Sequence, residues 1–138
     1  MSRLTAILLL SSLLLTRVSG AAEIIVHRDL EPFDMTRTIA RLVFTMRLLR
    51  WHDGTRVKVF VLPDSNATHK EFAKRSLGLY PRQLRRVWDR HLFSGAGAVP
   101  TEVDTVDEMI RRVAETPGAV GYVPDGVSWG KVRVIHVD

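Results

Sequence analysis

The hydrophobic and polar positions along the chain change period several times, and each change predicts a new element. Residues 22–27, AEIIVH, form a short apolar run rich in β-branched side chains, which is typical of a β-strand. After Thr36 the apolar residues recur at helical spacing, so they would line one face of an amphipathic helix. This stripe consists of Ile39, Leu42, Val43, Met46 and Leu49. We expect Asp34 or Thr36 to cap the helix and the Asp53-Gly54 pair to form the turn after it.

The middle of the chain predicts a buried strand followed by two helices. Residues 56–62, RVKVFVL, form a nearly continuous apolar run, which is typical of a strand buried on both faces. Residues 69–77, HKEFAKRSL, predict a helix, and a second helix begins at Pro81, a residue favoured in the first helical turn. We interpret His91 as a packing residue of this second helix. Its apolar stripe comprises Leu84, Val87, Trp88, His91 and Leu92.

The last third of the chain predicts one more helix and two strands. Thr105 and Glu108 have the spacing of a capping box, in which the two residues satisfy the first N–H groups of a helix. Residues 119–123, AVGYV, and 131–137, KVRVIHV, read as strands on either side of a turn. Strands that alternate with helices indicate an α/β domain, and we expect three layers around a small mixed sheet flanked by helices.

The N-terminal residues 1–22 have the pattern of a secretory signal peptide. Arg3 precedes an uncharged, mostly apolar run from Leu4 to Thr16, and small residues at 19–22 offer cleavage sites. This run is shorter than the roughly 20 residues that span a bilayer as a helix. We therefore expect cleavage, a single mature domain of residues 23–138, a periplasmic location and no integral membrane segment. An uncleaved membrane anchor is the alternative.

Composition and charge narrow the class of protein. The chain contains no cysteine, so no disulfide stabilises it, which suits a bacterial periplasmic protein better than a small extracellular eukaryotic one. The formal net charge is +5, and removal of the signal peptide takes away two arginines. Eight of the remaining arginines gather in residues 37–50 and 82–90, but the export signal argues against nucleic-acid binding. Solvated helix faces explain both groups.

The sequence lacks the patterns of an enzyme or a metal site. Its five histidines stand singly, without the pairs or neighbouring ligands that metal sites require. The acidic residues within 104–108 lie where carboxylates complement the start of a helix, which is a better explanation than a catalytic pair. We expect no catalytic activity, no metal and no cofactor. An enzyme is the third hypothesis, and convergence of Asp53, Asp64 and His69 in one cleft would favour it.

The loop after the buried strand is the strongest candidate for a binding site. In residues 59–72, VFVLPDSNATHKEF, an apolar strand ends at Pro63, polar residues follow, and a helix begins near Thr68. The first N–H groups of a helix have no internal partner and its dipole favours negative charge, so such a junction can bind an anion. The alternative is that the loop residues only cap their own helix.

Four stretches of the chain, taken in order, resemble one family. They are TIARLVFTMRLLRWHDG, LPDSNATHKEF, LRRVWDRHLFSGAGAVPTEV and TPGAVGYV, of which the last is the most specific. The family is that of the phosphate ABC transporter substrate-binding proteins, which form the PstS-like group of the type 2 periplasmic binding protein superfamily. Within it, the chain resembles a short single-lobe branch most closely. One departure is that Thr45 and Met46 stand where the family often has Gly-Lys. The resemblance implies a non-enzymatic, exported solute-binding protein with a three-layer α/β lobe.

The resemblance also implies a ligand, phosphate or a related small oxyanion, and an ABC permease or another envelope protein as partner. Family members hold phosphate with an Arg-x-Asp-Gly-Ser-Gly-Thr loop that falls on residues 62–68 here. The implied oxyanion loop consists of Asp64, Ser65, Asn66 and Thr68.

The arginine of that family loop is absent from this chain, because Leu62 occupies its position. A guanidinium is the cation that best matches a phosphate, since it can donate two parallel hydrogen bonds. Losing one partner of such a buried pair costs about 2–5 kcal/mol, or roughly 30-fold to several thousand-fold in affinity. Lys58, Lys70 or an arginine from the two groups would have to replace it.

The length of the chain leads to a second hypothesis. Classical members of the family enclose the ligand between two lobes, whereas residues 23–138 suffice for about one. A phosphate held on one open lobe would be exposed to water and weakly bound. The chain would then be a degenerate lobe that acts as an accessory or interaction module, a partner of an envelope protein or a sensor subunit, without a ligand.

Overall fold

The structure of the chain, a computed structural model, describes residues 22–95, 97–127 and 130–138. Residues 1–21 lie outside this part, so the signal peptide and its cleavage stay predictions. Within the described residues, no helix has the length and apolar character needed to cross a membrane.

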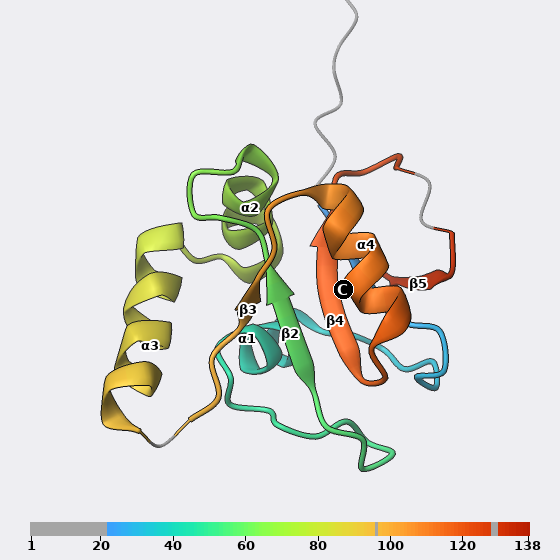
Figure 1. Cartoon of the computed structure of the whole chain (residues 1–138), viewed down its shortest axis with the longest axis horizontal. Coiled ribbons are helices and arrows are strands. Elements are labelled where there is room, and N and C mark those ends of the chain that lie inside the picture. Colours follow the sequence, from blue (N-terminus) through green and yellow to red (C-terminus); the bar gives the residue numbers. More distant parts are fainter. Residues whose placement is uncertain (1–21, 96, 128–129) are drawn as a thin grey trace, which may run out of the picture.

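Five strands form one mixed sheet in the order β3-β2-β4-β1-β5 (Figure 1). The strand β2 runs parallel to both β3 and β4, whereas β1 runs antiparallel to both β4 and β5. The predicted α/β class and the small mixed sheet are therefore confirmed, although the short edge strand β3 was not predicted. The strands are β1 (Glu23–His27), β2 (Lys58–Val61), β3 (Thr101–Glu102), β4 (Ala119–Val123) and β5 (Val132–Ile135).

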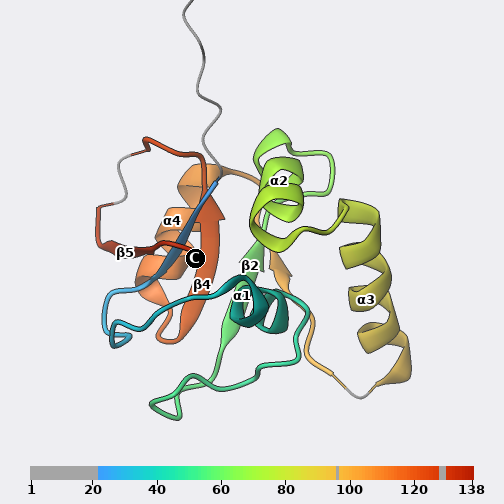
Figure 2. The ribbon, with the colours of Figure 1, turned by 180° about the vertical axis from the view of Figure 1, so that it is seen from behind.

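Helices cover both faces of the sheet, which confirms the three layers. One face carries α4, and the opposite face carries α1 and η1 (Figures 1 and 2). The helix α3 stands to one side, outside the β3 edge, and packs on η1. The helices are α1 (Arg37–Phe44), α2 (Ala67–Glu71), its π-helical continuation η1 (Phe72–Leu77), α3 (Pro81–Ser94) and α4 (Val106–Glu115).

The helix α1 is shorter than its apolar stripe predicted. Thr36 caps its start by accepting a hydrogen bond from the N–H of Ile39, but the helix ends at Phe44. Met46 has a φ of 62°, and bonds from Met46 N to Val43 O and from Arg47 N to Leu42 O close a Schellman motif. Glycine is the usual residue at that left-handed position, so with a methionine there the sequence contains no signal that the helix ends. Leu49, predicted to lie on the buried stripe, is 53% exposed.

The predicted capping box at α4 forms only in part. Thr105 Oγ1 accepts from the N–H of Glu108, as expected, but the Glu108 carboxylate accepts from the N–H of Asp104 rather than from that of Thr105. The helix predicted over 69–77 begins two residues earlier, at Ala67.

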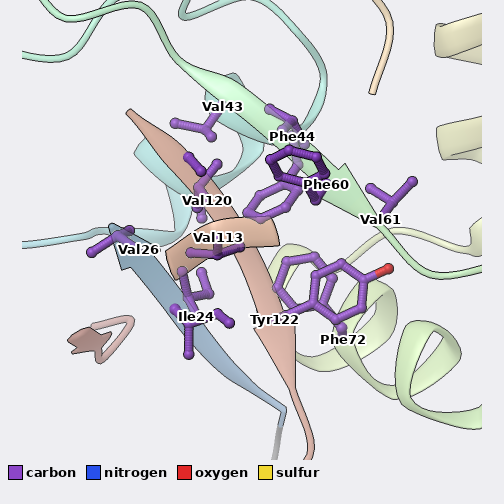
Figure 3. Close-up of a cluster of buried hydrophobic side chains, with 14 of the residues drawn as sticks. Ile24, Val26, Val43, Phe44, Phe60, Val61, Phe72, Val113, Val120 and Tyr122 are labelled. Atoms are coloured by element: carbon purple, nitrogen blue, oxygen red, sulfur yellow. The ribbon is translucent and has the colours of Figure 1, made fainter. Parts of the chain in front are cut away.

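The core lies between the sheet and the helices on its two faces, and Tyr122 of β4 is its largest fully buried side chain. Its ring stacks on Phe72 with centroids 4.0 Å apart, and Phe72 meets Phe44 edge-on at 4.7 Å (Figure 3). The two glycines of the GAVGYV run, residues 118–123, have a packing reason. A Cβ on Gly118, which has a φ of 78°, would lie 2.1 Å from the carbonyl oxygen of Arg56, and one on Gly121 would lie 2.4 Å from Met109 Sδ.

Candidate functional site

The loop between β2 and α2 meets an arginine of α3. Arg85 Nε donates to Asp64 Oδ2 at 2.8 Å, and Arg85 Nη2 donates to Asp64 Oδ1 at 2.9 Å. Both side chains are 38% exposed, so the pair lies at the surface rather than in the core. The hydrogen bonds from Arg85 lower the pKa of Asp64, which is a carboxylate at neutral pH. A bidentate guanidinium therefore lies at the loop although Leu62 stands at the position where an arginine was expected.

The other residues of the predicted oxyanion loop have different roles. Asn66 is the N-cap of α2, and its Oδ1 accepts from the N–H of Thr68 at 2.8 Å and from that of His69 at 3.2 Å. The capping alternative is thus realised by Asn66. Ser65 is exposed and Thr68 is half-buried. Within residues 22–95, the N–H of Ala67 has no hydrogen-bond partner, so one donor at the start of the helix stays available.

A chain of buried hydrogen bonds, through the side chains of Tyr122 and His69, lies directly beneath the loop. Tyr122 Oη accepts from the N–H of Leu62 at 2.9 Å and is hydrogen-bonded to His69 Nδ1. Because the Tyr122 oxygen accepts from Leu62, its hydroxyl proton can be donated to His69 Nδ1, which leaves the ring proton of His69 on Nε2. That Nε2 is buried, has no hydrogen-bond partner in the described part of the chain, and lies 3.8 Å from Asp64 Oδ1.

Burial decides the charge of His69. Its side chain is completely buried, and this desolvation lowers the pKa of His69 although the nearby carboxylate of Asp64 favours the charged form. The neutral imidazole, with its proton on Nε2, is therefore the form that faces Asp64 at neutral pH. Burial likewise raises the pKa of Tyr122, which keeps its hydroxyl proton.

We expect His69 to make folding stability depend on pH. Its folded pKa lies below the ordinary value, so the unfolded chain takes up a proton first, and stability is complete above about pH 6.5 and falls as the pH drops below it. Urea unfolding between about pH 7.5 and 5.5 should show this loss, and His69→Gln should flatten it. The matched control is His52→Gln, which replaces a partly exposed ring and keeps His69, so the loss of stability assigned to His69 should persist. An equal slope in wild type and His69→Gln would contradict the assignment.

The remaining candidates do not converge on the loop. Asp53 lies in the turn at the opposite end of β2, where its carboxylate accepts from the N–H of Thr55 at 2.8 Å. Asp64 and His69 come together, with His69 Nε2 3.8 Å from Asp64 Oδ1, but Asp53 does not join them. The exposed side chains of Lys58 and Lys70 make no hydrogen bond or ion pair with the loop in the described residues. That part of the chain holds no group of three or more His, Cys, Asp or Glu side chains able to bind a metal.

Sequence reasoning did not single out Arg85, although one signal was present. Arg85 lies next to Leu84 and three positions before Trp88, at the border of the buried stripe, whereas Arg82 and Arg86 lie away from it. Beside Arg85 is a hollow of about 80 Å³ that is also lined by Trp88 and Glu102. This volume is far below the ~300–1,000 Å³ of pockets for organic ligands, so the hollow admits only a small ion or water.

Comparisons with known proteins show a similar fold among solved structures but do not assign the chain to a family. A scan against models of protein families gives no match, and a search of the curated proteins gives none. Among solved structures, the chain is similar to an ABC-type phosphate transport receptor from Vibrio cholerae, with 14% identity and a TM-score of 0.65 over 85% of this chain and 46% of that one.

Two further structures give the same result. One is a phosphate ABC transporter substrate-binding protein with bound phosphate from Clostridium perfringens, with 16% identity and a TM-score of 0.68 over 86% of this chain and 45% of that one. The other is PstS from Borrelia burgdorferi, with 12% identity and a TM-score of 0.60 over 86% of this chain and 47% of that one. The chain has the fold of these proteins and spans a little under half of their length.

Proposed function

We propose that the chain is a non-enzymatic, exported solute-binding protein that holds a small oxyanion, inorganic phosphate first, at the loop between β2 and α2. The observation that carries the proposal is the bidentate pair of Arg85 and Asp64 at the start of α2. This pair places a guanidinium group at the loop, although Leu62 occupies the position of the family arginine. The Nη1 group of Arg85 and the N–H of Ala67 are the donors that we assign to the anion.

Asp64 selects among oxyanions by its charge. The carboxylate repels a fully deprotonated anion but can accept a hydrogen bond from one that still carries a proton. Phosphate keeps a proton at neutral pH, whereas sulfate does not. Because Arg85 lowers the pKa of Asp64, this acceptor stays ionised throughout the neutral range. We therefore assign the site to phosphate or arsenate rather than to sulfate.

Exposure limits the affinity of the proposed site. Arg85 and Asp64 are more than one-third exposed, so water and salt weaken their interactions with a ligand. Two charge-assisted hydrogen bonds are worth roughly 1.5–3 kcal/mol each. At best they give a dissociation constant between tens of micromolar and several millimolar, on the order of −6 to −3 kcal/mol. An ABC permease or another envelope protein that covers the loop would tighten the binding.

Calorimetric titration of residues 23–138 at low ionic strength tests the proposal. We expect heat of binding with phosphate, and affinity at least about tenfold lower for sulfate. The double variant Asn66→Ala, Thr68→Ala should weaken phosphate binding, because the loss of the cap disorders the first turn of α2. Circular dichroism of that variant checks that the domain remains folded. Absence of heat up to about 50 mM phosphate, well above the weakest affinity expected, would refute the proposal if the protein is folded.

The capping role of Asn66 favours a second candidate function. Because Asn66 already satisfies the N–H groups of Thr68 and His69, the loop is stable without a ligand. The chain would then be an accessory module that binds an envelope protein or a sensor subunit. A phosphate titration without heat, together with a specific partner recovered from an envelope extract by the tagged domain, would decide for this candidate.

A further inference from the structure

The outer face of α3 carries arginines and aromatic residues that the rest of the domain leaves uncovered. Arg82, Arg86 and Arg90 follow one another at four-residue spacing, so they form one stripe along the helix, and all three are exposed. Tyr80 precedes the stripe and is 65% exposed, and Phe93 ends it and is 84% exposed. We call these five residues the outer α3 face.

The charges of this face are not neutralised within the domain. None of its three arginines forms an ion pair with another described residue. Arg85, one position before Arg86, is instead bound to Asp64 and lies over the ring of Trp88. The helix thus has two separate faces: Arg85 meets the oxyanion loop, whereas the three arginines of the outer α3 face are exposed to solvent. Asp89 lies half-buried between them and is the acidic residue nearest the stripe on α3.

A basic hollow adjoins the outer α3 face. It has a volume of about 300 Å³ and is lined by Thr45, Arg47, Val87, Arg90 and His91. Arg47 follows α1, so two elements each contribute an arginine to it. Two guanidinium groups on a common hollow suit a phosphodiester, which carries one negative charge and several acceptor oxygens.

Exposed apolar side chains complete the pattern. Tyr80 and Phe93 flank the arginine stripe, and Phe93 is 84% exposed although phenylalanine is usually buried. Leu92 is also exposed, but it lines the hollow beside Arg85 and so belongs to the other face of α3. Exposed aromatic residues beside a basic stripe are typical of a helix that lies in the interface of a membrane, where arginines contact headgroups and aromatic rings enter the acyl boundary. An acidic protein surface would match the arginines, but it gives no reason for Phe93 to project at the end of the helix.

We propose that the outer α3 face docks the domain onto the surface of a bilayer that contains anionic phospholipid. Arg82, Arg86 and Arg90 contact lipid phosphates, a headgroup enters the basic hollow, and Phe93 inserts between the acyl chains. The docking does not use Arg85, so it is independent of the proposed oxyanion site.

Sedimentation with vesicles tests this proposal. The domain should bind vesicles of about 70% phosphatidylcholine and 30% phosphatidylglycerol at about 50 mM salt, and should bind much less to pure phosphatidylcholine or at about 500 mM salt. The triple variant Arg82→Gln, Arg86→Gln, Arg90→Gln should lose affinity about a hundredfold, since each arginine contributes about fivefold. Phe93→Ser should lose about tenfold, because the apolar insertion is removed.

A control with the same change of net charge separates docking from general attraction. Arg28, Arg111 and Lys131 are exposed and lie in or next to β1, α4 and β5, whereas α3 stands beside the opposite edge of the sheet. Replacing these three by glutamine should change vesicle affinity by less than about threefold. An equal loss in this control, or binding to neutral vesicles as strong as to anionic ones, would overturn the proposal. So would a dimer in solution that the α3 triple variant converts to a monomer, because a second copy would then cover the face.

Discussion

Replacing Arg85 by glutamine is expected to weaken phosphate binding by at least about thirtyfold in calorimetric titrations. The substitution removes the guanidinium that we assign to the anion, and it leaves the Asp64 carboxylate uncompensated, so that Asp64 then repels the ligand. The domain should remain folded, because an ion pair at this exposure contributes at most about 1 kcal/mol to stability. Loss of binding without loss of structure is therefore the expected result.

The matched control is Arg86→Gln. It removes the same charge one residue further along α3, on the side that faces solvent, so phosphate affinity should stay within about twofold of wild type. Arg85→Lys should fall between the two, since an ammonium keeps the charge but cannot donate two parallel bonds to Asp64. If Arg86→Gln weakens binding as much as Arg85→Gln, phosphate is attracted by the general positive charge of α3 and the loop is not the site.

Replacing Tyr122 by alanine is expected to lower the free energy of unfolding by about 5 kcal/mol, a large part of the ~5–15 kcal/mol that a domain has. The ring is completely buried and stacks on Phe72 in the core (Figure 3). Its removal leaves a cavity, and the N–H of Leu62 and the ring of His69 lose their partner at the same time. Urea unfolding followed by circular dichroism measures the change.

The variant Tyr122→Phe separates the two contributions. It keeps the ring and its stacking but removes the hydroxyl, so the buried N–H of Leu62 is left without its acceptor. We expect a loss of about 1–3 kcal/mol, with most of the packing retained. If Tyr122→Phe were as stable as wild type, water would have to reach Leu62 and His69. The conclusion that the hydrogen bonds beneath the loop are closed to water would then be refuted.

The sequence predicted those parts of the fold that depend on interactions between residues close together in the chain. The change of period from two to helical spacing is local, and so are the caps at Thr36 and Thr105 and the apolar run that becomes β2. Together they predicted the α/β class and the order of most elements. The same reasoning located the loop at 62–68, since a strand that runs into a capped helix is defined by adjacent residues.

The sequence did not predict where α1 ends or that β3 forms one edge of the sheet. Met46 adopts a left-handed conformation that methionine rarely takes, because its side chain is buried there and its N–H and that of Arg47 close the helix. The strand β3 has two residues, both exposed, and it exists because β2 offers a parallel edge. A pattern this short carries no periodicity of its own.

The amino-acid sequence by itself determined the α/β class, the absence of disulfides, the loop with Asp64 and its cap, and the arginine-rich character of α3, because each of these depends on composition or on residues a few positions apart. Only the tertiary structure decided which arginine serves the loop. Asp64 and Arg85 are 21 positions apart, and His69 and Tyr122 are 53 apart. Their meeting depends on how α3 and β4 pack around η1, and the buried surface of many side chains sets that arrangement. The same packing turns Arg82, Arg86 and Arg90 outward, and it thereby separates the ligand face of α3 from its outer face.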